Sequence, residues 1–406
     1  MLFPTLRKTI ITLAASVMLA VGVTTMAQNA VEVSGINLDQ LQKTGYRIDW
    51  INQPTSKGLR LPTITKDSFY TVDNSDFVSK YDIDSGKWLW STPVGNQTYK
   101  IKGITEIKNL KRTYVLSEGG IYVIETINGD YPSNADSKNQ DNSQFFPLQE
   151  IANTSATSFN GQMIYGSTTG NAVWFNPSIG FTACTYNIGS LVDVSPTYVT
   201  GIRTDRGMTS NIIVTASTDG TVIAIDAKDI QQLWTISLLD AVAAPVSYGT
   251  NNRIRENEDI PRSSVFIAGT DRYLRSVDLH TGRPRWRVLT ESPLEDSPFF
   301  SKTVVYQRIP KVGLAAFQAF PDDFSGNQDW IAEDISGTVI TTTKDGKLVC
   351  WDKQEKILQI ADPRKGGIVA TLSLPSIRSL TTDQQINGSL FLITESDTIL
   401  RLDPRR

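Results

Sequence analysis

Short runs rich in Val, Ile, Thr and aromatic residues recur along most of the chain, and glycine or aspartate turns separate them. Residues 212–215, 265–268, 339–343 and 390–394 are such runs, and alternating apolar and polar positions follow the turns, as in residues 348–351. β-branched and aromatic residues favour strands, and Asp-Gly pairs favour tight hairpins. No segment keeps a helical period. The pattern therefore predicts an all-β protein made of many short antiparallel strands.

A repeat of roughly fifty residues, in the length range of propeller blades, orders these strands. Gly and Trp follow an acid at offsets of four and eight in Asp82-Gly86-Trp90, Asp278-Gly282-Trp286 and Asp322-Gly326-Trp330, and Asp226 has Trp234 at eight. Weaker copies begin at Glu125, Asn176, Asp352 and Asp403, with Cys184 and Ile360 in the Trp position of two of them. Six residues before the acids lie the turn residues Asp76, Gly119, Gly170, Gly220, Arg272, Gly346 and Asp397.

Each unit thus contains two strands around a tight turn and a third strand after the Asp-x-x-x-Gly turn. Upstream runs such as residues 244–247 and 297–300 supply an inner strand. Four antiparallel strands per unit are typical of a β-propeller, and the eight acids predict eight blades. Asp322 and Asp352 are only 30 residues apart, so a seven-bladed ring with residues 311–330 as an insertion is the alternative. We favour eight, because Asp322-Gly326-Trp330 keeps both offsets.

The two ends of the chain are predicted to meet. The last unit stops soon after Asp403, without an outer strand, and residues 46–50 form an unassigned strand that contains Trp50. If this strand completes the last blade, the ring has no open edge between its first and last units. We therefore expect a short tail over residues 28–43 and one propeller domain over residues 44–406.

Residues 1–27 have the pattern of a signal peptide. Arg7 and Lys8 precede the apolar residues 10–23, and Thr25-Met26-Ala27 offers small residues for cleavage. No later segment is apolar enough to span a membrane, and no Cys stands at the cleavage point to carry a lipid. We expect an exported protein of the periplasm or cell surface that is not lipid-anchored and has no transmembrane segment once mature.

Charge and composition narrow the function classes. The chain has 39 basic and 42 acidic residues, for a net charge of −3, which argues against binding nucleic acid. Because the chain has a single histidine, His280, any site that needs several histidines is excluded. Cys184 and Cys350 fall in units three and seven, on nearly opposite sides of the ring. They are therefore expected to be free and buried rather than bonded.

The segments 82–90 and 278–286, each an acid, a Gly turn and a terminal Trp, resemble the PQQ-like repeat of the quinoprotein-like β-propellers. In that family the Trp docks against the next blade. The resemblance implies one of two branches: quinone (PQQ)-dependent dehydrogenases, or the non-enzymatic, BamB-like outer-membrane assembly factors. A dehydrogenase needs a quinone, Ca²⁺ and an Asp base, and many relatives carry a vicinal Cys pair. That pair, a Cys-x-x-Cys-His haem motif and long insertions are absent from the sequence.

We therefore predict a non-catalytic envelope scaffold that binds a protein or an extended peptide, possessing no catalytic, cofactor-binding or metal residues and acting as a monomer. A quinone-dependent dehydrogenase of a small alcohol or sugar and a polysaccharide-binding module are the alternatives.

Most conspicuous residues have a structural interpretation. The Asp82–Gly86 segment is expected to be a turn rather than a Ca²⁺ loop, and His280 a solvated turn residue. Trp90, Trp234, Trp286 and Trp330 are predicted locks between blades, whereas Trp88, Trp174 and Trp351 are candidates for exposed aromatics. Residues 130–144, 201–210 and 249–262 are polar loops that can carry binding.

Overall fold

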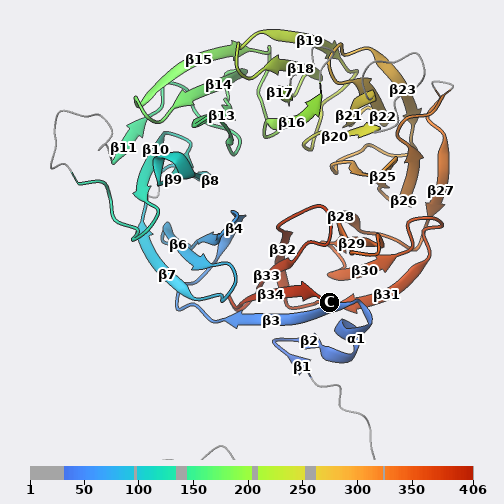
Figure 1. The fold of residues 1–406 in the computed structure, drawn as a ribbon, viewed down its shortest axis with the longest axis horizontal. Coiled ribbons are helices and arrows are strands. Elements are labelled where there is room, and N and C mark those ends of the chain that lie inside the picture. Colours follow the sequence, from blue (N-terminus) through green and yellow to red (C-terminus); the bar gives the residue numbers. More distant parts are fainter. Residues whose placement is uncertain are drawn as a thin grey trace, which may run out of the picture.

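The computed structural model describes residues 32–95, 98–133, 144–203, 209–251, 262–322 and 325–405. Eight four-stranded sheets surround a central axis and form a closed ring (Figure 1). All strand pairs within the blades are antiparallel, with Tyr70 opposite Lys80 in the first blade and Ala224 opposite Trp234 in the fourth. The predicted all-β, eight-bladed propeller is therefore confirmed, and the seven-bladed alternative is wrong.

The blades follow one another in chain order, and each runs from an innermost strand to an outermost one. Blade one contains β4 (Arg60–Ile64), β5 (Ser68–Val72), β6 (Phe77–Asp82) and β7 (Trp88–Pro93). Blade two contains β8 (Ile101–Ile107), the 3-10 helix η1 (Lys108–Leu110), β9 (Arg112–Ser117), β10 (Gly120–Glu125) and β11 (Phe145–Pro147). Blade three contains β12 (Thr157–Phe159), β13 (Gln162–Gly166), β14 (Asn171–Asn176) and β15 (Phe181–Asn187), and blade four contains β16 (Thr197–Arg203), β17 (Thr209–Ala216), β18 (Thr221–Asp226) and β19 (Gln232–Ser237).

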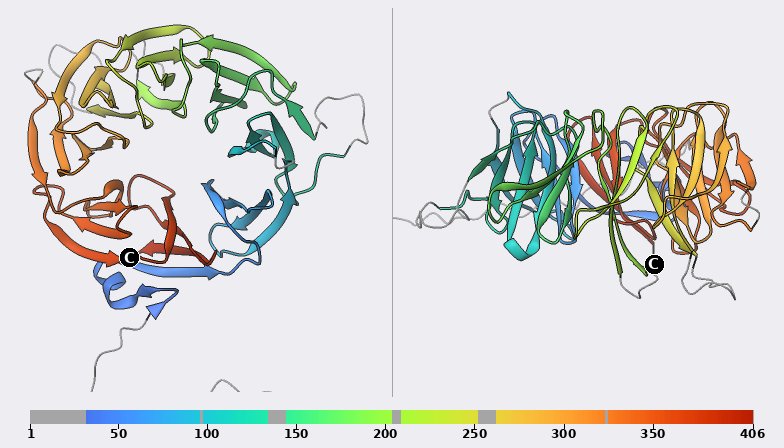
Figure 2. Two further views of the ribbon diagram at one scale, coloured as in Figure 1. Left: turned by 180° about the vertical axis from the view of Figure 1, so that it is seen from behind. Right: turned by 90° about the horizontal axis from the view of Figure 1, so that it is seen from above.

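Blade five contains β20 (Ser247–Asn251), β21 (Arg262–Ala268), β22 (Tyr273–Asp278) and β23 (Pro284–Leu289). Blade six contains β24 (Phe299–Ser301), β25 (Val304–Ile309), β26 (Gly313–Gln318) and β27 (Gln328–Ala332). Blade seven contains β28 (Thr338–Thr342), β29 (Leu348–Asp352), β30 (Ile357–Ala361) and β31 (Ile368–Ser373), and blade eight contains β32 (Ile377–Thr382), β33 (Leu390–Thr394), β34 (Ile399–Pro404) and β3 (Tyr46–Asn52). The first strand of each blade lies nearest the axis and the last lies on the outer rim (Figures 1 and 2).

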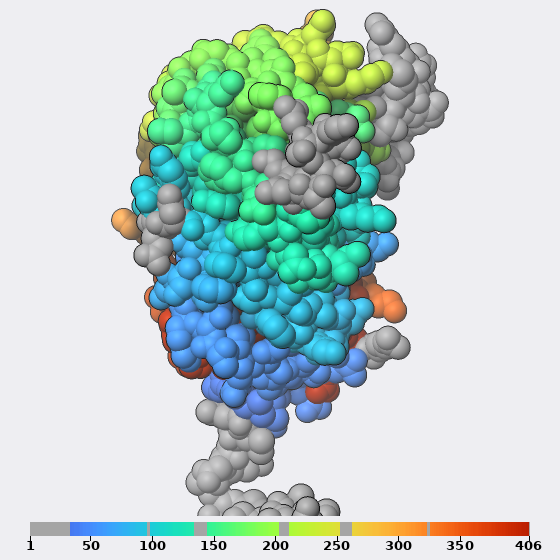
Figure 3. Space-filling model, turned by 90° about the vertical axis from the view of Figure 1, so that its left-hand side faces the viewer, coloured from blue at the N-terminus to red at the C-terminus, as the bar shows by residue number. Residues whose placement is uncertain are grey.

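The core is divided among the spaces between neighbouring blades. Middle strands are covered on both faces, so the four central positions of β14 and of β18 are all buried. One apolar cluster joins β17 and β18 to β21 and β22 of the next blade, and comparable clusters occur around the ring. Figure 3 shows the rim from one side, where the colours run from blue to green in chain order. Each blade therefore depends chiefly on its two neighbours.

The seventh blade differs from the prediction in register. The turn at Asp345-Gly346 lies between β28 and β29, so Asp352 ends the second strand rather than the third. The acid that follows the third strand, β30, is Asp362, and its backbone carbonyl accepts from Gly366 N at 2.9 Å. The inner strand, for which the short spacing left little room, is β28. The predicted mark at Asp352 is therefore wrong by one strand, although the blade count is right.

The sixth blade is displaced as well. Its third strand, β26, ends at Gln318, and Gln318 N donates to Asn327 O at 2.9 Å across a long turn that contains Asp322. Asp322, Gly326 and Trp330 therefore have the spacing of the motif, but Asp322 does not end the third strand as the acid of the motif does. Counted from the ends of the third strands, Gln318 and Asp362 restore the even spacing that Asp322 and Asp352 lacked.

The N-terminal strand closes the ring as predicted. β3 pairs antiparallel with β34, from Tyr46 opposite Pro404 to Asn52 opposite Ile399, and becomes the outermost strand of the eighth blade. Strands from near the two ends of the described chain therefore share one sheet, and backbone hydrogen bonds join the N-terminal strand to the last blade.

Part of the segment expected to be a tail is folded. β1 (Glu32–Val33) and β2 (Ile36–Asn37) form a hairpin, and α1 (Leu38–Lys43) follows. The Asn37 side chain caps α1 by accepting from Gln40 N at 3.0 Å. Ile36 and Leu41 are buried in the cluster between blades seven and eight. Neither described helix has the length and apolar character that a membrane crossing requires. The predicted signal peptide, residues 1–27, lies outside the described residues.

Candidate functional site

Tryptophans at the predicted position link neighbouring blades. Each indole N–H donates to the backbone carbonyl just past the end of the next blade's third strand. The bonds are Trp50 to Ile83 (3.0 Å), Trp90 to Thr126 (3.1 Å), Trp234 to Leu279 (2.7 Å), Trp286 to Ala319 (3.0 Å) and Trp330 to Pro363 (3.1 Å). Trp330 is half-buried and the others are buried. The predicted lock role of Trp90, Trp234, Trp286 and Trp330 is confirmed.

The glycine of the Asp-x-x-x-Gly turn makes room for the preceding blade's indole. A Cβ on Gly86 would lie 2.4 Å from the Trp50 ring, and one on Gly282 would lie 2.6 Å from the Trp234 ring. Both glycines also have positive φ, at 67° and 68°, which side chains rarely adopt. The acid-Gly turn of one blade and the Trp of the preceding blade therefore form a joint together.

At the other three joints a different side chain takes the place of the indole. Between blades two and three this is Phe146, and a Cβ on Gly180 would lie 2.4 Å from its ring. Between blades three and four it is half-buried Cys184, and Tyr186 OH donates across the joint to Gln232 Oε1 at 2.7 Å. At the Phe146 joint the glycine of the turn therefore still faces an aromatic ring, whereas the turn after β18 has Ile230 at positive φ in place of the glycine.

The joint between blades seven and eight uses the N-terminal segment. Because the third strand of blade seven ends near Asp362, the position of the lock holds Ala370 rather than the predicted Ile360, which pairs with it on β30. Ile36 and Leu41 complete the apolar cluster at this joint. We infer that the folded N-terminal segment substitutes there for the missing indole.

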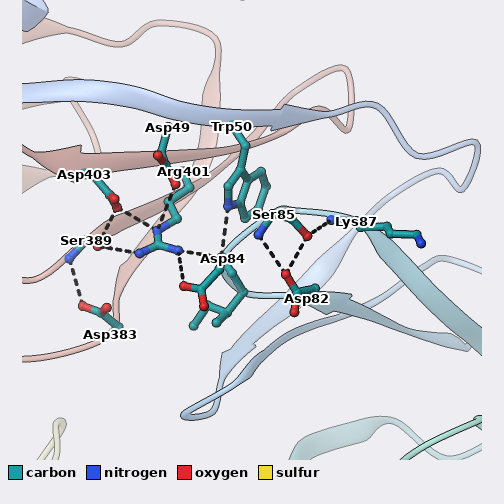
Figure 4. A network of polar contacts seen from close by, with 11 residues as sticks. Asp49, Trp50, Asp82, Asp84, Ser85, Lys87, Asp383, Ser389, Arg401 and Asp403 are labelled. Atoms are coloured by element: carbon teal, nitrogen blue, oxygen red, sulfur yellow. Dashed lines mark hydrogen bonds and ion pairs between the residues drawn. The ribbon is translucent and has the colours of Figure 1, made fainter.

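Arg401 on β34 is the centre of the polar network that joins the last blade to the first (Figure 4). It donates to Asp403 Oδ1 at 2.7 Å, to Asp84 Oδ1 at 3.2 Å and to Ile83 O at 2.7 Å, the carbonyl that also accepts from Trp50. Partial burial alone would lower the pKa of Arg401, but the surrounding carboxylates raise it. The guanidinium therefore stays charged and neutralises acids at the closure.

The neighbouring acids in Figure 4 serve turns and strand ends. Asp82 Oδ1 accepts from Ser85 N at 2.8 Å and from the Ser85 hydroxyl at 2.5 Å, and these bonds hold the pKa of Asp82 below its usual value. Asp383 Oδ1 accepts from Ser389 N at 2.9 Å, while burial raises the pKa of Asp383. Asp82 caps its turn, as the sequence predicted in preference to a Ca²⁺ loop.

The other residues singled out in the sequence fall into structural roles, with one exception. His280 lies in the turn after β22, where its backbone N–H donates to Asp278 Oδ1 at 3.1 Å, but it is half-buried rather than solvated as predicted. Both cysteines are free, as predicted. Cys350 is buried, which raises the pKa of its thiol, whereas Cys184 is half-buried rather than buried. Trp174 is 0% and Trp351 8% exposed, so their predicted exposure is wrong; Trp88, at 54%, is exposed as predicted.

Within the described ranges, no three His, Cys, Asp or Glu side chains come together in a way that could hold a metal ion. The centres of the three predicted binding loops, residues 134–143, 204–208 and 252–261, lie outside the described residues. The polar clusters that can be described hold turns and joints in place.

A family model agrees with the repeats that the structure shows. A model of the PQQ_2 family, described as outer membrane protein assembly factor BamB, matches residues 160–405. The chain belongs to this family. The PQQ_2 assignment agrees with the resemblance of segments 82–90 and 278–286, the first of which lies before the matched residues.

Solved structures show the same architecture. The crystal structure of BamB from Moraxella catarrhalis matches with a TM-score of 0.63 and 14% identity, covering 88% of this chain and 97% of that one. The computationally designed Ika8 protein matches with a TM-score of 0.61 and 13% identity, covering 87% and 98%. At such identities the likeness concerns the fold alone. No curated protein sequence matches the chain.

The rim of this PQQ_2 propeller combines the edges of outermost strands with exposed apolar side chains. Every one of the eight outermost strands carries an exposed large apolar side chain. These are Ile51, Trp88 with Leu89, Phe145, Phe181, Leu233, Leu289, Ile331 and Val369, with exposures from 37% to 55%. Unpaired strand edges with apolar side chains are suited to contact another chain.

Proposed function

We propose that the protein is a non-catalytic scaffold of the cell envelope, which binds a protein or an extended peptide on the outside of its ring during outer-membrane protein assembly. The apolar side chains on all eight outermost strands carry this proposal, because they flank strand edges to which another chain can add. Membership of a family described by the name BamB supports it. The protein is further proposed to be exported, to act as a monomer in the periplasm or at the cell surface, and not to bind nucleic acid.

Site-specific photo-crosslinking in the envelope tests the proposal. A photoreactive residue placed at Leu233 or Val369, on outermost strands, should capture one dominant envelope protein. The same residue at Ile127 or Ile386, which are 82% and 67% exposed but lie off these strands, is the matched control. Equal capture at all four positions, or no capture at the rim, would refute a rim-binding scaffold.

Binding of polysaccharide is the second candidate, because Trp88 on β7 is 54% exposed beside Leu89. Flat exposed aromatics can stack on sugar rings through their apolar faces. If this role is correct, envelope polysaccharide should quench tryptophan fluorescence in the wild type but not in Trp88→Ala. Quenching that persists in Trp88→Ala would place any sugar contact elsewhere.

A further inference from the structure

Blade five carries a cluster of basic side chains. Residues 271–287 hold Arg272, Arg275, Arg283, Arg285 and Arg287 against only Asp271 and Asp278. This gives +3 on one hairpin of a chain whose net charge is −3. The corresponding residues 219–235 of blade four hold three Asp and one Lys, or −2. The charge of the rim therefore changes sign between these two neighbouring blades.

Not all of these arginines are used by the fold. Arg275 pairs with Asp271, and Arg285 pairs with Asp278 at 2.6 Å. Arg272, Arg283 and Arg287 are exposed and form no ion pair with any residue in the described ranges. The Arg287 guanidinium lies 5.3 Å from the centre of the Tyr273 ring, which makes a second cation–π contact with Arg275 at 4.9 Å. The Tyr273 ring thus helps to hold Arg287 at the surface.

Of the three unpaired arginines, Arg287 lines a groove between blades four and five. The groove has a volume of about 580 Å³ and is lined by the end of β19 and by β22 and β23. Ile236, Leu238 and Leu239 form one side, and Arg275, Arg285 and Arg287 the other. Leu239 and Leu289 are 84% and 55% exposed. One wall is therefore apolar, and the other carries one guanidinium without an ion pair among the described residues, that of Arg287.

The strand next to the groove has an unpaired edge. β23 is the outermost strand of its sheet, and among the described residues it pairs only with β22. Arg283 comes just before β23, Arg287 lies within it, and Arg272 lies beside its far end, where Thr290 N donates to Arg272 O at 2.7 Å. At about 3.4 Å per residue, Arg283 and Arg287 are at most roughly 13 Å apart, because the chain between them includes the bulge of β23.

We propose that an extended acidic segment of a protein partner lies along β23, with carboxylates at Arg272, Arg283 and Arg287 and an apolar side chain in the groove against Leu239. The inference rests on the proposed scaffold function and gives its partner a chemistry. The free strand edge favours a peptide over a lipid surface, because only a peptide backbone can continue the ladder of hydrogen bonds. Acids spaced by four residues would match Arg283 and Arg287.

A peptide array tests the proposal directly. The full-length protein is labelled and applied to an array of extended decapeptides in which acidic, basic and neutral residues are varied among alternating Val and Thr. We expect it to select peptides with carboxylates four residues apart. The triple variant R272E/R283E/R287E should lose about tenfold or more of this binding, because three attractive contacts become repulsive.

A matched variant separates this site from general attraction to anions. K87E/R364E/K365E changes the charge equally at exposed positions on blades one and seven and should bind the selected peptides as the wild type does. Thermal melting of both variants establishes that they are folded, and R287E alone, a single exposed change, should give a partial loss. Selection of acid-free peptides, equal losses in both triple variants, or undiminished binding by R272E/R283E/R287E would overturn the proposal.

Two further outcomes are distinct. Co-sedimentation of the wild type, but not of R272E/R283E/R287E, with phosphatidylglycerol vesicles, without selection of any peptide, would show that the groove recognises lipid and overturn the peptide assignment. If rim crosslinking captures a partner equally from the wild type and from R272E/R283E/R287E, the scaffold function stands and the groove is wrong. If crosslinking captures no protein from the wild type, the scaffold function itself fails.

Discussion

Replacing a single lock should destabilise the whole ring. Trp286 is 3% exposed, its ring centre lies 6.1 Å from that of Phe266 and 6.4 Å from that of Phe317, and its N–H donates to Ala319 O at 3.0 Å. Trp286→Ala removes this packing and leaves the Ala319 carbonyl without its partner. We expect a loss of about 4 kcal/mol in the free energy of unfolding, within the range of roughly 3–5 kcal/mol for such truncations.

Calorimetry and urea unfolding followed by far-ultraviolet circular dichroism measure this loss without relying on tryptophan emission. With an unfolding entropy of about 2 cal/mol/K per residue, 4 kcal/mol lowers the melting temperature of a 406-residue chain by about 5 °C. Trp88→Ala is the matched control, since Trp88 is 54% exposed and should change stability by about 0.5 kcal/mol or less. Trp286→Phe should fall between the two. If Trp286→Ala and Trp88→Ala shift the transition equally, the lock assignment is refuted.

Four further changes test the joints and turns, each by urea unfolding. Gly282→Ala should destabilise more than Gly45→Ala: both lie at positive φ, where alanine costs about 1 kcal/mol or more, but only Gly282 faces an indole, whereas a Cβ on Gly45 meets nothing within 4 Å; equal effects would contradict the joint. Arg401→Met should cost about 2 kcal/mol by removing charged hydrogen bonds at the closure, and a neutral result would show that β3 alone closes the ring. Leu41→Ala should cost roughly 2–4 kcal/mol if the buried N-terminal segment seals blades seven and eight, while a surface-like effect would remove that role. The Ser217 hydroxyl and a backbone N–H lower the pKa of Asp219, so its stabilisation is present above the ordinary aspartate pKa near 4 and is lost as the pH falls through the lowered value; Asp219→Asn should therefore weaken the acid dependence of stability, and an unchanged profile would refute this.

The sequence predicted the blades because the joints need particular residues at fixed distances. A glycine with positive φ must lie under an indole, so Gly86 and Gly282 recur four residues after an acid. Closure by Trp50 was predictable for the same reason, since the last blade lacked an outer strand and one tryptophan-containing strand was left over. Both features follow from covalent spacing alone.

Features that depend on pairing between strands were not predictable in this way. The seventh blade was misplaced because Asp345-Gly346 is a strong hairpin signal wherever it occurs, and only the pairing of β28 with β29 shows which hairpin it joins. The exposure of Trp174 was wrongly predicted because it stands outside the lock position of the repeat. It lies in the middle of β14, where neighbouring blades cover both faces.

The candidate binding groove is hidden from sequence analysis by the alternation of one strand. In β23, Trp286 is buried and bonds to blade six, while its neighbour Arg287 is exposed and contacts Tyr273 within blade five. Side chains of successive residues in a strand point to opposite faces, so the lock and the exposed rim do not constrain each other. The buried positions therefore identify the propeller, whereas partner chemistry can change at the exposed positions without altering the ring. This explains why the repeat predicted the fold well and the binding site not at all.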